Sequence, residues 1–278
     1  MNREFDCGLK FFGRFVLATA FLLMCLPYPA HTSARARLGT TLIQKPNEKK
    51  AATTIPAGEA FTLHSNILGE DRTVFVAVPA SYSRSVQAYP VLYLTDAQWR
   101  FAHTRTTAAF LARNGIIPEM IIIGVTNPDR THDLYATRAA FKQNGRIISF
   151  PTSGNADRFL EFFEKELISW TEANYRTIPL RILAGHSAGG NFALHAIRMK
   201  PVLFQAIIAA SPWLAWDDHK ELNALVSFLA SANVPLRTLF FTFADEGAEM
   251  RAERNCQNQE HCRYRYKMES HATSLVVL

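Results

Sequence analysis

The sequence predicts an α/β fold, with a mostly parallel sheet and helices on both of its faces. Two observations predict it. Unbroken apolar runs at Pro90–Asp96 and Met120–Val125 are typical of strands that are buried on both faces. Further along the chain, short apolar segments alternate with helical patterns, which is the order of strand–helix–strand units in a parallel sheet.

The hydrophobic pattern sets the expected elements. Besides the two runs above, we expect strands at Phe61–Ile67, Thr73–Pro79, Arg181–Ala184, Gln205–Ala210, Arg237–Phe243 and Arg263–Met268. We expect helices at Phe101–Arg113, Ala156–Tyr175, Asn191–Met199 and Lys220–Ala230. Residues 127–153, rich in charge, Gly and Pro, read as a loop. The last strand, RYRYKM, alternates basic and apolar side chains, so charges on an edge strand explain it better than a nucleic-acid patch.

The first 36 residues have the order of a secretory signal peptide. Lys10 and Arg14 precede the 12-residue apolar run FVLATAFLLMCL, and Ala34-Arg35-Ala36 follows as a cleavage site. A membrane span needs about 20 apolar residues, so an anchor fits less well. Lipidation at Cys25 is an alternative, although Met24 is a poor residue before it. We expect export to the periplasm or the medium, a flexible arm at 37–57 and a folded domain at 58–278.

Composition and charge are those of an ordinary folded protein. The 278 residues are 48% hydrophobic and 19% charged, with a formal net charge of +6. Loss of residues 1–36 removes four basic and two acidic residues, which leaves +4 and gives no argument for nucleic acid. Cys256 and Cys262 would remain, and an even pair in an exported protein indicates a disulfide. A zinc site with His261 lacks paired ligand spacing.

The segment GHSAG, residues 185–189, follows an expected strand and precedes an expected helix. Taken alone, Ser187 could be a helix cap, because serine is a common N-cap residue. At a strand-to-helix junction of this fold, however, a serine flanked by glycines occupies a sharp turn and presents its hydroxyl at the carboxyl edge of the sheet. The sequence therefore predicts that Ser187 is a nucleophile.

A serine nucleophile needs a base and an acid, which in this fold follow it in the order acid, then histidine. The acid should come just after Arg237–Phe243. We select Glu246, with Asp245 and Glu249 as alternatives. Of the histidines after Ser187, His271 is the best placed, since it follows the last expected strand. The others are His195, expected to be structural, His219, which precedes the acid, and His261, between the two cysteines.

The remaining expectations concern the substrate. Backbone N–H groups of Ala188 and of Ala97 or Gln98 should hold the developing oxyanion. Aromatic and cationic side chains near the site could line a substrate pocket, although packing is the commoner role of such aromatics: Trp99, Arg130, Trp213 and Trp216. No metal or organic cofactor is expected, since the triad supplies its own nucleophile and base. The expected partner is a small-molecule ester.

Several motifs together resemble the esterase family of the α/β-hydrolase superfamily that includes enterochelin esterases and esterase D. They are YPVLYLTDAQWRF, GVTNPDRTHDL with Asn127, Arg130 and Asp133, NYRTIPLRILAGHSAGG and AASPWLAWDD, and they extend the likeness over residues 58–271. The resemblance implies an α/β-hydrolase fold without a large lid domain and a serine carboxylic-ester hydrolase. Some relatives cleave siderophore trilactones, and others transfer acyl chains to sugars.

The chain departs from the family pattern at three places. Ala97 follows Asp96 where the family usually has glycine, the segment between acid and histidine is short, and the sequence given ends seven residues after His271 at an apolar tail. Two other functions therefore stand beside hydrolysis: acyl transfer on the same triad, and binding by a catalytically inactive protein of this fold.

Overall fold

The computed structural model describes residues 57–143, 146–230, 238–242 and 274–277. The strands in these residues are β1 (Glu59–Ser65), β2 (Glu70–Ala77), β3 (Tyr89–Leu94), β4 (Ile121–Val125), β5 (Ala139–Gln143), β6 (Arg146–Phe150), β7 (Thr177–His186), β8 (Ala206–Ala210), β9 (Thr238–Thr242) and β10 (Ser274–Val277). The helices are α1 (Ala97–Arg113), α2 (Arg130–Leu134), α3 (Ala156–Phe162), the π-helix η1 (Phe163–Leu167), α4 (Ile168–Asn174), α5 (Ala188–Met199) and α6 (Lys220–Leu229).

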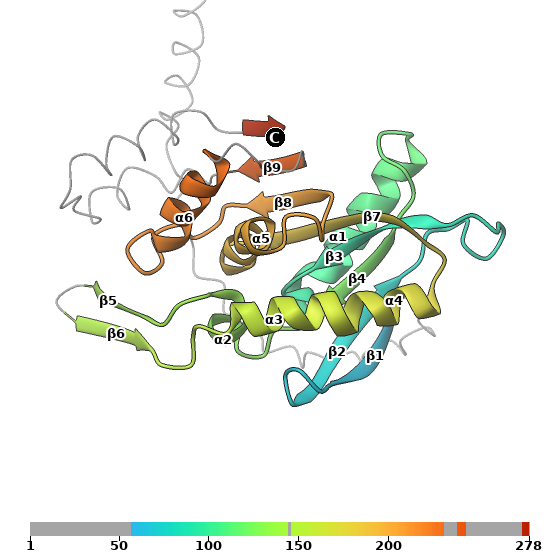
Figure 1. The fold of residues 1–278 in the computed structure, drawn as a ribbon. Coiled ribbons are helices and arrows are strands. Elements are labelled where there is room, and N and C mark those ends of the chain that lie inside the picture. The colour runs from blue at the N-terminus through green and yellow to red at the C-terminus, as the bar shows by residue number, and fades with distance from the viewer. Residues whose placement is uncertain (1–56, 144–145, 231–237, 243–273, 278) are drawn as a thin grey trace, which may run out of the picture. The chain divides into compact units, whose positions relative to one another are not determined.

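Eight of the strands form one sheet in the order β1-β2-β4-β3-β7-β8-β9-β10 (Figure 1). The five central strands, from β4 to β9, run parallel, while β1, β2 and β10 pair antiparallel at the two ends. Helices cover both faces, so the predicted α/β-hydrolase architecture is confirmed. Within the described residues no large lid domain interrupts the sheet.

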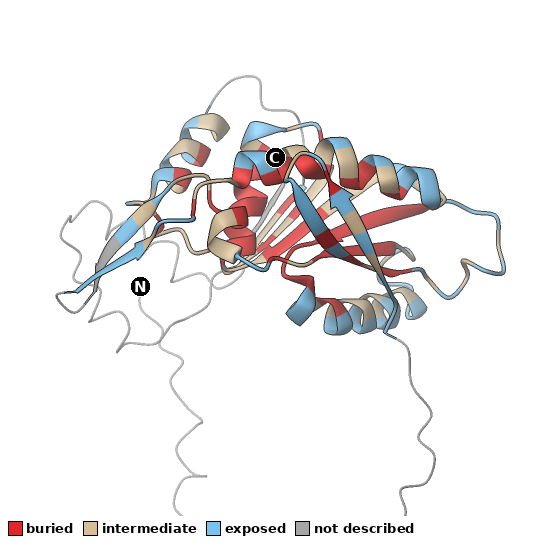
Figure 2. Cartoon of the chain, turned by 90° about the horizontal axis from the view of Figure 1, so that it is seen from below, coloured by how far each residue is buried: buried red, intermediate tan, exposed pale blue. Residues whose placement is uncertain are grey.

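The side chains of β3 show how the sheet is buried on both faces. Every residue of β3 is buried, and successive residues point to opposite sides. One face packs on α1, and the other packs on a larger core with the helices from α3 to α6 (Figure 2). On the α1 side, Leu92 and Leu94 meet Ala97 and Phe101. On the other side lie Tyr93, Leu183, Ile207, Phe159, Phe163 and Phe192.

The structure corrects the expected loop at 127–153, which contains α2 and the hairpin β5–β6. β6 lacks an apolar–polar alternation because little of this strand is buried: Ile147 is 76% exposed and Ile148 39%. The sequence signal of the hairpin is the dipeptide Asn144-Gly145 between the two strands, which is typical of a tight hairpin turn.

Two other boundaries differ in ways that matter below. α1 begins at Ala97, four residues before the expected start, so Ala97 and Gln98 belong to its first turn. The expected helix at 156–175 is a continuous helical run, but its middle turn, η1, is π-helical.

Other expectations fall on residues outside the described ranges. These are the signal peptide, the arm apart from its last residue, and the strand at Arg263–Met268. The apolar tail is partly described: Ser274–Val277 forms β10, antiparallel to β9, with Ser274 opposite Phe241. Among the helices that are described, we find none with the length and apolar character that crossing a membrane requires.

Candidate active site

Ser187 lies at the sharp turn between β7 and α5 and has the backbone angles φ 57° and ψ −115°. A positive φ is uncommon for a residue with a side chain, and such strain persists only where the surroundings hold it. Here the Ser187 N–H donates to the Ala210 carbonyl at 3.0 Å, and the Ser187 carbonyl accepts from Trp213 N–H at 3.2 Å. The turn is thus tied to the carboxyl end of the neighbouring strand β8.

The glycines around Ser187 are required by close packing. A Cβ at Gly185 would lie 2.0 Å from the carbonyl oxygen of Gly189, and a Cβ at Gly189 would lie 2.3 Å from Thr95 Oγ1. A Cβ at Gly190 would meet Pro212 at 3.0 Å. Strand, turn and helix can therefore approach this closely only without side chains, as the sequence motif predicts.

The expected oxyanion donors lie at the same edge of the sheet. β3 and β7 are parallel neighbours, with Leu94 beside Ala184, so the residues after each strand share the carboxyl edge. Ala97 and Gln98 open α1, and Ala188 opens α5. An α-helix leaves the N–H groups of its first turn without intrahelical partners, so these groups are suited to an anionic oxygen.

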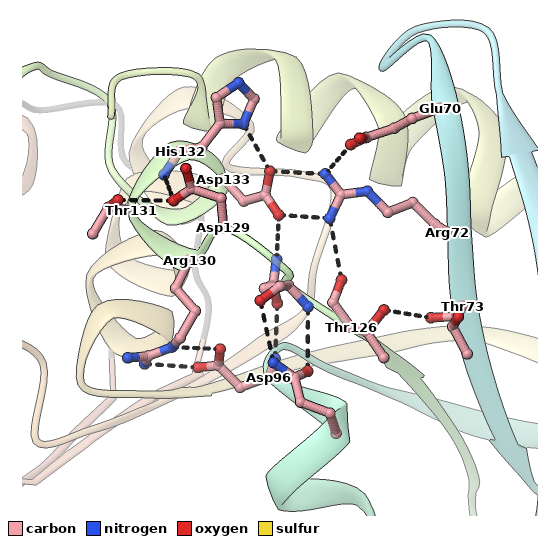
Figure 3. Close-up of polar contacts among 12 residues, drawn as sticks. Glu70, Arg72, Thr73, Asp96, Thr126, Asp129, Arg130, Thr131, His132 and Asp133 are labelled. Atoms are coloured by element: carbon pink, nitrogen blue, oxygen red, sulfur yellow. Dashed lines mark hydrogen bonds and ion pairs between the residues drawn. The ribbon is translucent and has the colours of Figure 1, made fainter. Parts of the chain in front are cut away.

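Arg130, an expected pocket residue, is paired with the residue that precedes α1 (Figure 3). Its Nε and Nη2 donate to the two carboxylate oxygens of Asp96 at 2.7 and 2.9 Å. Hydrogen bonding to Asp96 raises the pKa of Arg130 above its ordinary value. The guanidinium carbon also lies 5.4 Å from the ring centroid of Trp99, which is 63% exposed. These contacts join a cation and an accessible aromatic face beside the expected oxyanion turn.

The two other expected pocket residues follow β8. Trp216 is 2% exposed, stacks on Tyr135 with the ring centroids 3.6 Å apart, and donates its indole N–H to the Thr137 carbonyl. It lines a cavity of about 150 Å³ together with polar residues of α5 and α6. Trp213 is partly buried and packs edge-on against Trp216. The Trp213 backbone N–H donates to the Ser187 carbonyl, so Trp213, and not Trp216, lies next to the nucleophile turn.

His186, which precedes the nucleophile, has a role that the sequence did not indicate. Arg100 donates from Nη2 to His186 Nδ1 at 2.8 Å. Because a guanidinium can only donate, Nδ1 is the acceptor and a neutral ring carries its hydrogen on Nε2. Burial lowers the pKa of His186, and the cations Arg100 and Arg130 lower it further. His186 is therefore a neutral hydrogen-bond donor beside Ser187. In the sequence, only its position directly before Ser187 could have pointed to His186 as a residue of the site.

His195, expected to be structural, is buried within α5 at 1% exposure. Its Nε2 lies 2.8 Å from Asp157 and its Nδ1 3.1 Å from Glu221, which also accepts from Arg198. These partners occupy both ring nitrogens. His219 precedes α6 in a left-handed conformation, and His261 lies outside the described residues.

A buried polar network, which the sequence did not predict, lies next to the expected oxyanion turn (Figure 3). Arg72 of β2 forms a two-pronged ion pair with Asp133 of α2, with N–O distances of 2.6 and 2.9 Å. Asp133 also accepts from the side-chain amide of Asn127 at 2.9 Å. All three are at most 2% exposed. The sequence showed Asn127 and Asp133 only as members of a motif, because Arg72, the charged partner of Asp133, is 61 residues away along the chain.

The remaining candidates fall outside the described residues: Glu246 with its alternatives Asp245 and Glu249, His271, Cys256 and Cys262. The described strands bracket the expected acid and histidine. β9 ends at Thr242, four residues before Glu246, and β10 begins at Ser274, three residues after His271. In the residues that the structure does describe, no group of three or more His, Cys, Asp or Glu side chains could hold a metal ion.

Comparison with known proteins gives consistent results. The family described as "Putative esterase" matches residues 65–273. Ferri-bacillibactin esterase BesA of Bacillus subtilis is 31% identical over 209 residues, which are 68% of this chain and 70% of BesA. The siderophore triacetylfusarinine C esterase of Aspergillus fumigatus is 29% identical over 65% of this chain and 64% of its own length. An IroE-like serine hydrolase from Shewanella oneidensis superposes with a TM-score of 0.62 at 33% identity, over 66% of this chain and 60% of that structure.

Proposed function

The chain belongs to this esterase family and is a serine ester hydrolase, and we propose that it works through an acyl-enzyme intermediate on Ser187, with His271 as base and Glu246 as acid. The Ser187 hydroxyl attacks the ester carbonyl as His271 takes its proton, and the protonated histidine returns that proton to the leaving alcohol. Water then attacks the acyl group by the same proton transfers in reverse and releases the acid. Glu246 orients His271 and stabilises its charged form.

The strained turn at Ser187 is the observation that carries this proposal. Its φ of 57° and the exclusion of side chains at Gly185 and Gly189 are explained by a need to expose the serine hydroxyl at the sheet edge. Chain connectivity supports the two partners. Because β9 ends and the antiparallel β10 begins at the carboxyl edge, Glu246 and His271 lie within four residues of that edge along the chain.

The proposed substrates are siderophore-type esters. This rests on the two relatives that are named as siderophore esterases. The exposed face of Trp99, with Arg130 against it, fits such a substrate, because aromatic and cationic groups together bind electron-rich aromatic or anionic groups. Ala97 or Gln98 would supply one oxyanion donor and Ala188 the other.

Export completes the proposal. The leader at residues 1–36 would direct the chain to the periplasm or the medium, and Cys256 and Cys262 would form a disulfide there. N-terminal sequencing of the protein recovered from cells should begin at Arg37. Peptide mapping without reductant, with cleavage after Glu260 between the two cysteines, should recover two peptides joined by a disulfide. Two free thiols would contradict the disulfide.

The test of substrate class uses purified protein and a cyclic trilactone siderophore, with and without bound iron. We expect release of its monomeric acid, and loss of about 10³-fold or more in kcat for Ser187→Ala. Short p-nitrophenyl esters serve as the generic comparison. Hydrolysis of those esters without any cleavage of the siderophore would contradict the substrate class and leave the esterase activity intact.

A further inference from the structure

The turn that leads into α1 has an unfavourable backbone conformation at Asp96 and lacks a side-chain helix cap, so contacts from other parts of the chain must stabilise it. Asp96 has a left-handed backbone, φ 55° and ψ 37°, and its side chain does not cap the helix. Its carboxylate is engaged by Arg130 instead. A left-handed conformation is unfavourable for a residue with a side chain, so neighbouring contacts must hold it.

Asn127, in the loop between β4 and α2, supplies these contacts with four of its polar groups. Its side-chain oxygen accepts the Asp96 N–H at 2.9 Å. Its backbone N–H donates to Gln98 Oε1, and its carbonyl accepts from Gln98 Nε2, both at 3.2 Å. Its side-chain amide donates to Asp133. Asn127 is 1% exposed, so losing these bonds would leave unpaired buried groups.

The far end of this set of contacts is buried. Asp133 is held there by the ion pair with Arg72, which extends from β2 (Figure 3). The position of Asn127 is therefore set by the sheet, while Asn127 in turn sets the backbone of residues 96–98. Side chains that lock a reactive geometry in this way act through preorganisation.

We propose that Asn127 and the Gln98 side chain are positioning residues, which hold the first N–H groups of α1 in the geometry that binds the oxyanion. The inference rests on the proposed function of Ser187, since only a tetrahedral intermediate needs that geometry. Neither side chain takes or gives a proton in the reaction. Their effect is on the backbone donors of Ala97 and Gln98.

The first experiment needs no activity. Hydrogen–deuterium exchange of the peptide covering residues 95–99 is compared between Ser187→Ala and the double variant Ser187→Ala/Asn127→Ala. We expect at least about tenfold faster exchange in the double variant, with other core peptides unchanged. Equal exchange in the two proteins would overturn the proposal that Asn127 holds the backbone of residues 96–98, whether or not the proposed esterase function stands.

The second experiment separates positioning from a general loss of structure. Gln98→Ala removes an exposed side chain and keeps the backbone donor, so it should fold even if Asn127→Ala does not. We expect each variant to lower kcat on p-nitrophenyl esters by roughly 10- to 100-fold with KM within threefold. The affinity for a trifluoromethyl ketone, which forms an oxyanion on the serine, should fall in parallel with kcat/KM.

The matched control is Thr171→Val, which removes a buried hydroxyl of α4 that donates to the Leu167 carbonyl of η1, and we expect it to lower stability without changing kcat. Wild-type kcat and ketone affinity in Gln98→Ala would overturn the proposal. If the wild-type protein shows no turnover that Ser187→Ala abolishes, the proposed function is contradicted instead. The exchange experiment would still decide whether Asn127 holds the backbone of residues 96–98.

Discussion

At the scale of the residue, backbone strain and tight packing coincide at Ser187. A positive φ at a residue with a side chain costs on the order of 1–3 kcal/mol, and hydrogen bonds to Ala210 and Trp213 hold it. The motif GHSAG predicted the serine and its glycines because these requirements are local. It could not predict that Arg100 holds His186 or that Thr95 excludes a side chain at Gly189, because both contacts join distant parts of the chain.

We predict that Gly189→Ala destabilises the protein by about 1–3 kcal/mol, since the new methyl group would lie 2.3 Å from Thr95 Oγ1. The free energy of unfolding in urea measures the effect. Thr95→Ala/Gly189→Ala should recover most of the loss, because the remaining contacts, at 3.4 and 3.5 Å, are ordinary and the Thr95 hydroxyl has no partner in the described residues. Additive losses in the double variant would contradict this explanation.

A second prediction concerns His186. Its folded pKa should lie below the ordinary value of about 6.5, because of burial and then of Arg100 and Arg130. The unfolded chain then binds the proton more strongly, so stability falls as the pH drops from about 6.5 through the folded pKa. An NMR titration of the ring gives the pKa directly. Arg100→Leu should raise it, and a wild-type value above 6.5 would refute the assignment.

At the scale of the element, the strands that are buried on both faces were predicted from the sequence, and the hairpin β5–β6 was not. β3 and β4 were predicted from unbroken apolar runs because both faces of each strand are buried. β5 and β6 were missed because neither carries an apolar–polar alternation, and in β6 the residues are largely exposed. The π-helical turn η1 was also missed. Its distinctive contact is made by Glu166, whose carboxylate accepts from Ser65 Oγ and from the N–H groups of Asn66 and Ile67, a hundred residues away.

Glu166→Ala should therefore lower the free energy of unfolding by about 1.5–3 kcal/mol, since it leaves the donors of the β1–β2 turn without their charged acceptor. Glu161→Ala, on the same helical run, is the control. It removes only an exposed ion pair with Lys165, which solvent screens, and should leave the free energy of unfolding almost unchanged. Hydrogen exchange of residues 65–68 should rise in the first variant alone. Similar exchange in both would show that η1 does not fix the turn.

At the scale of the whole molecule, the buried polar network joins the antiparallel end of the sheet to its catalytic edge. The fold class and the serine motif were predictable because the parallel sheet dictates where chain turns meet. The network was not predictable, since Arg72 and Asp133 are 61 residues apart and either charge alone reads as a surface residue. Glu246 and His271 stay predictions that rest on chain order and on the ends of β9 and β10.

Arg72→Met should destabilise the whole domain by about 3–5 kcal/mol, because it leaves the Asp133 carboxylate buried without its cation. Arg181→Met removes the more exposed pair with Glu172 and should cost about 1 kcal/mol or less. Thermal unfolding of both variants tests the difference. Equal shifts in Tm would mean that the buried pair does not anchor the network.

The most direct test of the central claim is mass spectrometry of protein that is acid-quenched during turnover of p-nitrophenyl acetate. We predict one added acetyl group per chain, located by digestion on the peptide that contains Ser187, and its absence in Ser187→Ala. His271→Ala should show slow or undetectable acetylation. Turnover that continues in Ser187→Ala, or an acetyl group mapped to another residue, would contradict the account.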